Sequence, residues 1–248
     1  IILVTGPTGS GKTTTLYSTL KRLATDEVNV TTIEDPIEMI EPAFNQTQVQ
    51  NQLDFGFAEG LRALMRQDPD IIMVGEIRDL ETAEMAIQAS LTGHLVFSTL
   101  HTNDSVSAIT RLLDLGVPSY LLSATIIGVL AQRLVRTLCP HCKQPDPLVT
   151  RESLNDLVKH WRLGGGVKPY KPVGCLECRN TGFRGRAGLY ELLTVSEGVK
   201  GAMTDLGSLR RQAVQEGLRP LRLAGAMKVA EGATTVEEVL RSTPAWEG

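Results

Sequence analysis

A glycine-rich turn between an apolar run and a helical segment is the feature that most constrains how this chain folds. The run Ile1–Thr5 is typical of a strand, and the segment Gly11–Ala24 is typical of a helix. Eight residues around the turn fit the pattern G-x-x-x-x-G-K-[ST]: Gly6, Pro7, Thr8, Gly9, Ser10, Gly11, Lys12 and Thr13. Glycines there let the backbone curl until successive N–H groups point at one anion. The sequence therefore predicts a strand–loop–helix unit that binds nucleotide phosphates.

The end of this motif supplies the charge that a nucleotide requires. The positive end of the following helix adds to the field of the loop N–H groups. We expect Lys12 to contact the outer phosphates and Thr13 to ligate magnesium, and we include Thr14 in the nucleotide-binding set. The alternative is a glycine-rich turn without a ligand, and the full motif in its required context argues against it. ATP or ADP with Mg²⁺ is the expected ligand.

Apolar runs alternate with helical patterns through the first half of the chain. The polar stretch Pro36–Asp54 reads as a long loop or hairpin. After the first unit we predict strands over Val28–Ile33, Asp70–Val74 and His94–Leu100, and helices over Phe57–Arg66, Leu80–Leu91, Ser105–Leu115 and Tyr120–Leu138. Stacked βα units of this kind build a mainly parallel sheet. The predicted fold class is α/β, a RecA-like P-loop core.

The composition changes at Cys139, after which prolines and glycines indicate irregular backbone. The segment Phe183–Thr194 is predicted as a short hairpin, and small helices are expected after it. We divide the chain into a nucleotide-binding core (1–138), a small cysteine-containing subdomain with the hairpin (139–196) and C-terminal helices (197–248). Because the chain opens directly on an apolar strand, we also expect an upstream domain to be missing from it.

Charge and composition argue against two classes of protein. The chain carries 28 acidic and 25 basic residues, a net charge of −3, and only 4% of its residues are aromatic. A dedicated nucleic-acid binder would show a basic surface and aromatic stacking platforms. A membrane span needs roughly 18 consecutive apolar residues, and no run here approaches that length. We expect an interior protein of a bacterium or archaeon, without a nucleic-acid partner and without a signal peptide.

Two carboxylates and two histidines follow or flank predicted strands. Glu34 ends one strand, and Glu76 follows another, with Gly75 where an aspartate is more usual. Ligands collect at the carboxyl ends of parallel strands, so one acid could lie near magnesium and the other serve as general base. The alternative is that each acid caps the next helix. Of the histidines, His101 at the strand's carboxyl end is better placed than His94, although a lone histidine is more often a satisfied core or surface residue.

All four cysteines of the chain form two C-x-x-C pairs: Cys139, Cys142, Cys175 and Cys178. Two such pairs close a tetrahedral Zn²⁺ shell without an open position, which indicates a structural site. A closed shell also stabilises a segment too rich in proline and glycine to build its own core. The alternatives are disulfides, which a reducing interior disfavours, and a redox dithiol, which would not need two pairs. His141 lies between two ligands and is expected to be a bystander.

Several stretches together resemble the secretion ATPase superfamily that drives type II secretion and type IV pilus assembly. They lie in the order of that family's Walker A, aspartate, Walker B and histidine boxes: Gly6–Thr15, Thr32–Glu38, Arg66–Asp79 and Thr92–Asn103. The likeness continues through Ala131–Leu134 to the cysteines and to Gly185–Glu191. Four boxes in order are more specific than a single phosphate-loop motif. The cysteine pairs point to the assembly and secretion branches of the family.

The resemblance implies roles that spacing alone did not assign. Glu34 would activate the attacking water, Glu76 would act through magnesium, and His101 would sense the γ-phosphate, with His94 as a further participant. Arg62 and Arg66 match arginines that the family brings to the active site. Without the resemblance, both would read as solvated helix charges.

The resemblance also implies the setting in which the protein works. Family members form hexameric rings with nucleotide between subunits, so a neighbour can complete the site. They act on a platform protein of the inner membrane, which implies a cytoplasmic protein that reaches the membrane only through partners. We therefore expect an ATP-hydrolysing motor for type II secretion or type IV pilus assembly. Two other hypotheses remain open: a nucleic-acid translocase, and a zinc-stapled assembly module in which ATP only gates binding.

Overall fold

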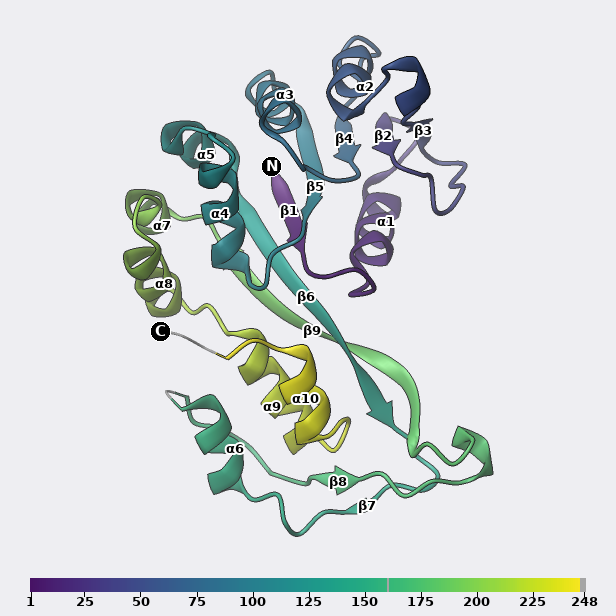
Figure 1. Cartoon of the computed structure of the whole chain (residues 1–248), viewed down its shortest axis with the longest axis vertical. Coiled ribbons are helices and arrows are strands. Elements are labelled where there is room, and N and C mark those ends of the chain that lie inside the picture. Colours follow the sequence, from purple (N-terminus) through teal and green to yellow (C-terminus); the bar gives the residue numbers. More distant parts are fainter. Residues whose placement is uncertain (160, 246–248) are drawn as a thin grey trace.

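A seven-stranded sheet forms the centre of the computed structural model, which describes residues 1–159 and 161–245. The strand order is β3-β2-β4-β5-β1-β6-β9, and every pairing is parallel except that of β6 with β9 (Figure 1). The strands are β1 (Ile2–Thr5), β2 (Val30–Glu34), β3 (Asn45–Gln48), β4 (Ile71–Val74), β5 (Leu95–Leu100), β6 (Gly128–Leu138) and β9 (Phe183–Thr194). The predicted α/β class with a mainly parallel sheet is confirmed.

Helices cover both faces of this sheet. They are α1 (Lys12–Leu23), α2 (Phe57–Leu64), α3 (Leu80–Leu91), α4 (Ser105–Asp114) and α5 (Ser119–Thr125). Alternate residues of β4 point to opposite faces: Met73 packs in the cluster that holds Leu20 of α1, whereas Ile72 packs in the cluster that holds Ile109 of α4. Because both faces are covered, β4 is buried throughout and reads as an uninterrupted apolar run.

Local capping explains where two of these helices begin. The carboxylate of Asp79 accepts the N–H of Thr82 at the start of α3, and that of Asp104 accepts the N–H of Ser107 at the start of α4. Each cap satisfies a backbone donor that has no partner within the helix. The helix after Glu76 is therefore capped by Asp79, which leaves Glu76 available for another role.

Two predicted elements are wrong in type. The predicted helix Tyr120–Leu138 is helical only as α5, after which residues from Gly128 form β6 between β1 and β9. The predicted hairpin Phe183–Thr194 is a single strand, β9, which runs antiparallel to β6 along nearly its whole length. In both cases pairing between distant segments overrides the local pattern. An apolar run of the length of 128–138 suits a buried strand as well as a helix, and β9 pairs with β6 instead of folding back on itself.

The C-terminal part packs back onto the sheet and onto the cysteine-containing segment. Its helices are α7 (Glu197–Ala202), α8 (Leu206–Gln215), α9 (Leu221–Ala230) and α10 (Val236–Ser242). The preceding segment holds α6 (Arg151–Val158), a 3-10 turn at Leu176–Cys178, and β7 (Gln144–Pro145), which pairs antiparallel with β8 (Tyr170–Lys171). A second 3-10 turn, Asn51–Leu53, lies between β3 and α2. Leu154 of α6 and Val229 of α9 share one apolar cluster, and Leu209 of α8 joins the main core. The division of the chain into three parts, with boundaries after residues 138 and 196, stays a prediction.

The described helices differ from membrane spans in length and hydropathy. Within residues 1–159 and 161–245, no helix combines the length and apolar character that a bilayer crossing demands.

Close packing between α9 and α10 leads to a stability prediction. A Cβ added at Gly225 would lie 2.5 Å from Cγ1 and 2.9 Å from Cγ2 of Val239, a stiff β-branched side chain that is fully buried. We expect Gly225→Ala to lower the free energy of unfolding by about 1–3 kcal/mol. Gly201 in α7 has open space around its added Cβ, so Gly201→Ala is the matched control and should stabilise by about 0.5–1 kcal/mol. Chemical denaturation of both variants measures the difference, and equal effects would contradict this packing account.

Candidate functional site

The carboxyl ends of β1, β2, β4 and β5 meet around a pocket of about 320 Å³. Ligands collect at this edge in open parallel sheets because loops and helix N-termini converge there. The pocket is lined by nine of the predicted site residues: Thr8, Gly9, Gly11, Lys12, Thr13, Thr14, Glu34, Glu76 and His101. The structure therefore brings together residues that are up to 93 positions apart in the sequence, since Thr8 lies in the same pocket as His101.

The phosphate loop adopts the backbone that its glycines predict. Gly9 and Gly11 have φ angles of 78° and 87°, in the left-handed region that favours glycine. At Gly6 a Cβ would lie 2.5 Å from the carbonyl oxygen of Gln132, so only glycine permits this approach to β6. Helix α1 then begins at Lys12 and directs its N-terminus at the pocket.

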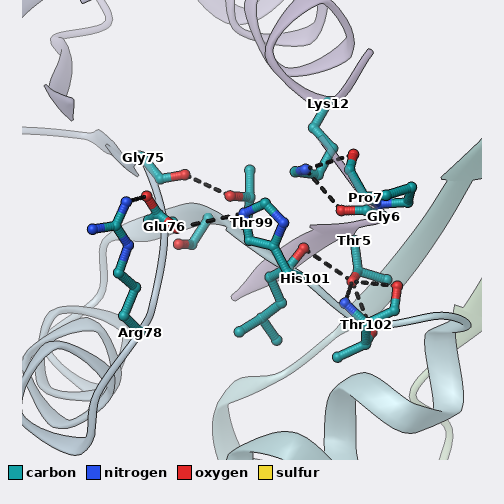
Figure 2. Close-up of polar contacts among 12 residues, drawn as sticks. Thr5, Gly6, Pro7, Lys12, Gly75, Glu76, Arg78, Thr99, His101 and Thr102 are labelled. Carbon is teal, nitrogen blue, oxygen red and sulfur yellow. Dashed lines mark hydrogen bonds and ion pairs between the residues drawn. The ribbon is translucent and has the colours of Figure 1, made fainter. Parts of the chain in front are cut away.

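The ammonium group of Lys12 folds back onto its own loop. Its Nζ donates to the carbonyl oxygens of Gly6 (2.8 Å) and Pro7 (3.2 Å), as Figure 2 shows. Burial lowers the pKa of Lys12, and the nearby carboxylate of Glu76 opposes that shift. A phosphate group in the pocket would compete with these two carbonyl oxygens for the ammonium protons, and its negative charge makes it the stronger acceptor.

Gln132 and Arg133, two buried polar side chains of β6, lie next to the phosphate loop. Gln132 donates from Nε2 to the carbonyl oxygen of Ser10 (2.7 Å) and accepts from the hydroxyl of Thr15 (2.7 Å). Arg133 donates to the carbonyl oxygens of Gln132 (2.9 Å) and Asn103 (2.6 Å), and burial lowers the pKa of its guanidinium. Sequence reasoning noted this stretch without a role for either residue. The signal in the sequence that could have indicated their role is that two polar residues interrupt an otherwise apolar run.

Glu34 is a buried carboxylate held by three donors. The hydroxyl of Tyr17 lies 2.7 Å from Oε2, and the hydroxyl of Thr32 lies 2.6 Å from Oε1. Gln46 adds a longer hydrogen bond of 3.2 Å to Oε1. Burial, followed by the contact with Glu34, raises the pKa of Tyr17, so the phenol stays protonated and remains a donor. Tyr17 and Gln46 were not among the predicted site residues.

Glu76 lies between a guanidinium and an imidazole. Its Oε1 pairs with Nη2 of Arg78, and its Oε2 lies 3.5 Å from Nε2 of His101 (Figure 2). Burial lowers the pKa of His101, the charge of Lys12 lowers it further, and Glu76 opposes both. The neutral imidazole is therefore favoured near pH 7, where it can both donate and accept a hydrogen bond. Arg78 is a further residue that sequence reasoning did not assign to the site.

Gly75 stands where a side chain would crowd the neighbouring strand. A Cβ there would lie 3.2 Å from the carbonyl oxygen of Ile33, and the carbonyl oxygen of Gly75 itself accepts from Thr99 at 2.6 Å. A side chain at this position, such as the aspartate more usual there, would need the neighbouring backbone to shift by a few tenths of an ångström. Glu76 is consequently the first acidic side chain after β4.

Three other predicted residues lie away from the pocket. His94 is at the opposite end of β5 from His101, and its Nδ1 lies 2.8 Å from the carbonyl oxygen of Ala89. Arg62 is exposed on α2, with its Nη2 3.6 Å from Glu81, and Arg66 is exposed just beyond that helix. Within the described part of the chain, neither arginine is among the residues that line the pocket. Their participation in catalysis stays a prediction.

The four cysteines converge in a geometry that fits zinc. All four Sγ atoms lie within 4.8 Å of one another, with 3.9 Å for Cys139–Cys175, 3.9 Å for Cys142–Cys178 and 3.7 Å for Cys175–Cys178. Tetrahedral Zn–S bonds of about 2.3 Å would separate the sulfurs by about 3.8 Å. The same distances exclude a disulfide, whose sulfurs lie about 2.05 Å apart. The cluster is therefore a candidate metal site.

Backbone donors around the cluster favour thiolates, the form that binds metal. The N–H of Gly174 points at the sulfur of Cys142 (3.3 Å), and those of Cys175 and Gly182 point at the sulfur of Cys178 (both 3.2 Å). Burial alone would raise the pKa of Cys178, but the N–H groups of Cys175 and Gly182 and the neighbouring thiols outweigh it and lower the pKa to about 6, whereas burial raises the pKa of the adjoining Cys175 to about 11. Zinc stays the predicted metal on this donor set.

Replacing a cysteine should remove the metal. We expect the purified chain to carry one zinc ion per molecule and Cys142→Ser to carry less than a tenth of that, because a closed shell tolerates no missing ligand. The melting temperature should fall as well, since metal binding stabilises the folded state. His141→Ala is the matched control, because His141 is exposed between two ligands. Elemental analysis by mass spectrometry gives the readout, and equal zinc in both variants would contradict the assignment.

Comparisons with known proteins agree with this geometry. A family model described as "Type II/IV secretion system protein" matches residues 1–241. The chain is 59% identical over 247 residues to the type IV pilus assembly ATPase TfpB of Acinetobacter baylyi, covering 98% of this chain and 42% of that protein. It is 51% identical over 245 residues to the type II secretion system protein E of Aeromonas hydrophila, covering 98% and 48% respectively. The chain thus spans less than half the length of these relatives.

Solved structures show the same architecture. The pilus retraction motor PilT with bound ADP matches with a TM-score of 0.68 and 31% identity, over 100% of this chain and 61% of that one. The ATPase DotB of Legionella pneumophila matches with a TM-score of 0.70 and 25% identity, over 97% and 58%. The resemblance identified from the four sequence boxes is confirmed, and this chain belongs to the type II/IV secretion system protein family.

Proposed function

We propose that the chain is an ATP-hydrolysing motor module that powers type II protein secretion or type IV pilus assembly. The observation that carries this proposal is the convergence of Lys12, Glu34, Glu76 and His101 on one pocket at the carboxyl edge of the sheet. A pilus assembly ATPase at 59% identity and a pilus motor with bound ADP at 31% identity support the same activity. These relatives include a type IV pilus assembly ATPase and type II secretion proteins, so the proposal covers both machines.

Phosphate binding follows from the loop and the helix behind it. Backbone N–H groups between Gly6 and Thr13, together with the N-terminus of α1, provide a concentrated positive field for the phosphates. Lys12 exchanges its two carbonyl contacts for the outer phosphates. Thr13 and Glu76 would hold magnesium, which neutralises part of the phosphate charge when it is bound. The donor set fits that ion, since a hydroxyl and a carboxylate are both oxygen ligands.

Two carboxylates and an imidazole have separate roles in the proposed hydrolysis. Glu34 orients the attacking water and accepts its proton, because it is a buried carboxylate in the pocket. His101 contacts the γ-phosphate and also contacts Glu76, whose Oε2 lies 3.5 Å from its Nε2, so it links the γ-phosphate to Glu76. Arg78 pairs with Oε1 of Glu76, which leaves Oε2 as the oxygen that would interact with magnesium. This division of roles distinguishes the proposal from a module in which ATP only gates binding.

A ring of identical subunits completes the proposed motor. Arg62 is exposed on α2 and Arg66 just beyond it, where a neighbouring subunit's nucleotide can reach them. We infer a homo-hexamer that reaches the inner membrane only through a platform protein, on the cytoplasmic side. The cysteine cluster serves as a structural zinc site that stabilises the segment between β6 and β9.

Steady-state ATP hydrolysis tests the proposed activity directly. We expect magnesium-dependent turnover by the purified chain, a loss of about 10²-fold or more in Lys12→Ala, and a loss of about 10²–10⁴-fold in Glu34→Gln. Glu34→Gln should still bind ATP, because it changes proton transfer and not the phosphate loop. Glu197→Gln, at an exposed residue of α7, is the matched control and should keep full activity.

Three outcomes would argue against this assignment. Absence of nucleotide binding in the wild-type chain would overturn the proposed function. Turnover by Glu34→Gln at the wild-type rate would remove Glu34 from its role as base. Stimulation of turnover by DNA, lost at high salt, would instead favour a nucleic-acid translocase.

Mixing two inactive variants tests whether the arginines act between subunits. The double variant Arg62→Ala/Arg66→Ala keeps its own phosphate loop, whereas Lys12→Ala keeps both arginines. If the arginines serve a neighbour's nucleotide, mixed rings contain some complete sites, and a mixture should recover a measurable fraction of wild-type turnover. Inactive mixtures that nevertheless form rings would show that the arginines do not act in trans.

A further inference from the structure

The hydroxyl group of Tyr17 joins the helix after the phosphate loop to Glu34. It donates to Oε2 of Glu34 at 2.7 Å and lies 3.1 Å from the carbonyl oxygen of Met39. It also accepts from Nε2 of Gln46, at 2.8 Å. Three segments of the chain, α1, the end of β2 and β3, therefore meet at one phenol oxygen.

The ring of Tyr17 is held so that this oxygen has little freedom. Its side chain is 3% exposed and packs edge-on against Phe44, with ring centroids 5.5 Å apart. Tyr17 also lies only one turn beyond Lys12–Thr13, on the helix that begins at the phosphate loop. The phosphate loop and Glu34 are therefore joined through one helical turn and one hydrogen bond.

The two oxygens of Glu34 have different numbers of donors. Oε1 accepts from Thr32 at 2.6 Å and from Gln46 at 3.2 Å, whereas among the described residues Oε2 accepts only from Tyr17. A carboxylate oxygen offers two acceptor positions. The amide nitrogen of Gln46 carries two hydrogens and has three acceptors within reach: the hydroxyl of Tyr17 at 2.8 Å, the carbonyl oxygen of Met39 at 2.9 Å and Oε1 at 3.2 Å, so its contact with Oε1 is the weakest of the three. The short hydrogen bonds from Tyr17 and Thr32 therefore hold one carboxylate oxygen each, and the carboxylate keeps acceptor capacity for a proton from water.

We propose that Tyr17 and Gln46 are positioning residues, which orient Glu34 so that its carboxylate accepts the proton of the attacking water. This inference rests on the proposed ATP hydrolysis and adds the residues that aim its base. Neither residue lines the pocket, so each acts through Glu34 and not on the nucleotide. A base held within a narrow range of orientations speeds the reaction, because less conformational entropy is lost when the transition state forms.

The test separates orientation of the base from nucleotide binding. Tyr17→Phe keeps the ring against Phe44 and removes only the hydroxyl, and Gln46→Met keeps the side-chain length and removes the amide donor. We expect kcat to fall about tenfold in Tyr17→Phe, as for loss of a hydrogen bond to a charged group, with KM and the Kd for ATP within twofold of wild type. Gln46→Met should lower kcat in the same direction.

Matched controls exclude general effects of these changes. Tyr120 is 69% exposed on α5, and Gln48 lies on the same strand as Gln46, where its side chain accepts from the N–H of Ile37. Tyr120→Phe and Gln48→Met should both keep wild-type kcat. Melting temperatures measured for all variants ensure that every assay is done on folded protein.

A double-variant cycle decides whether Tyr17 acts through Glu34. In a Glu34→Gln background, measured by single-turnover hydrolysis, Tyr17→Phe should change the rate less than twofold, because the base that it orients is already absent. An equal tenfold loss in that background, an unchanged kcat in the wild-type background, or a loss confined to KM would each overturn the proposal. A wild-type chain without turnover would instead overturn the proposed function itself, so the two failures are distinguishable.

Discussion

Main-chain pairing of β1 with β5 on one side and β6 on the other determines where the phosphate loop can lie. Ile2 to Thr5 pair in register with Phe97 to Leu100 and with Gly128 to Ala131, so the last residue before the loop is held from both sides. The N–H of Gly6 continues this ladder to the carbonyl oxygen of Leu100, at 3.3 Å. The loop therefore leaves the sheet beside His101, and its geometry follows from that exit.

Side-chain contacts of β6 and β9 connect the nucleotide pocket to the rest of the molecule. Arg133 of β6 reaches Asn103, and Asp104 pairs with Arg210 of α8 at 3.3 Å. Behind them, the buried carboxylate of Glu191 accepts from the N–H and hydroxyl of Ser105 and from the N–H of Leu221. Burial raises the pKa of Glu191 although these donors oppose the shift. One acid on β9 thus ties the starts of α4 and α9 together.

Much of the site was predictable because its signals are local. A strand, a glycine-rich turn and a lysine in sequence require no distant contact to specify a phosphate loop, and the structure places that loop where it was predicted. The acids at Glu34 and Glu76 follow strands, and parallel strands bring their carboxyl ends to one edge. The cysteine pairs are similarly local, although their convergence required two segments 36 residues apart to meet.

What spacing alone determined about this protein is the chemistry of its phosphate loop, strand-end acids and cysteine pairs, because each depends on residue types at fixed short separations. The tertiary structure decided that 128–138 is a strand, since only pairing with β1 and β9 distinguishes it from a buried helix. It also decided which donors surround Glu34, because Tyr17 and Gln46 reach that carboxylate from separate elements. Such contacts leave no periodic trace in the sequence: they exist only once the sheet has brought distant segments within hydrogen-bonding distance.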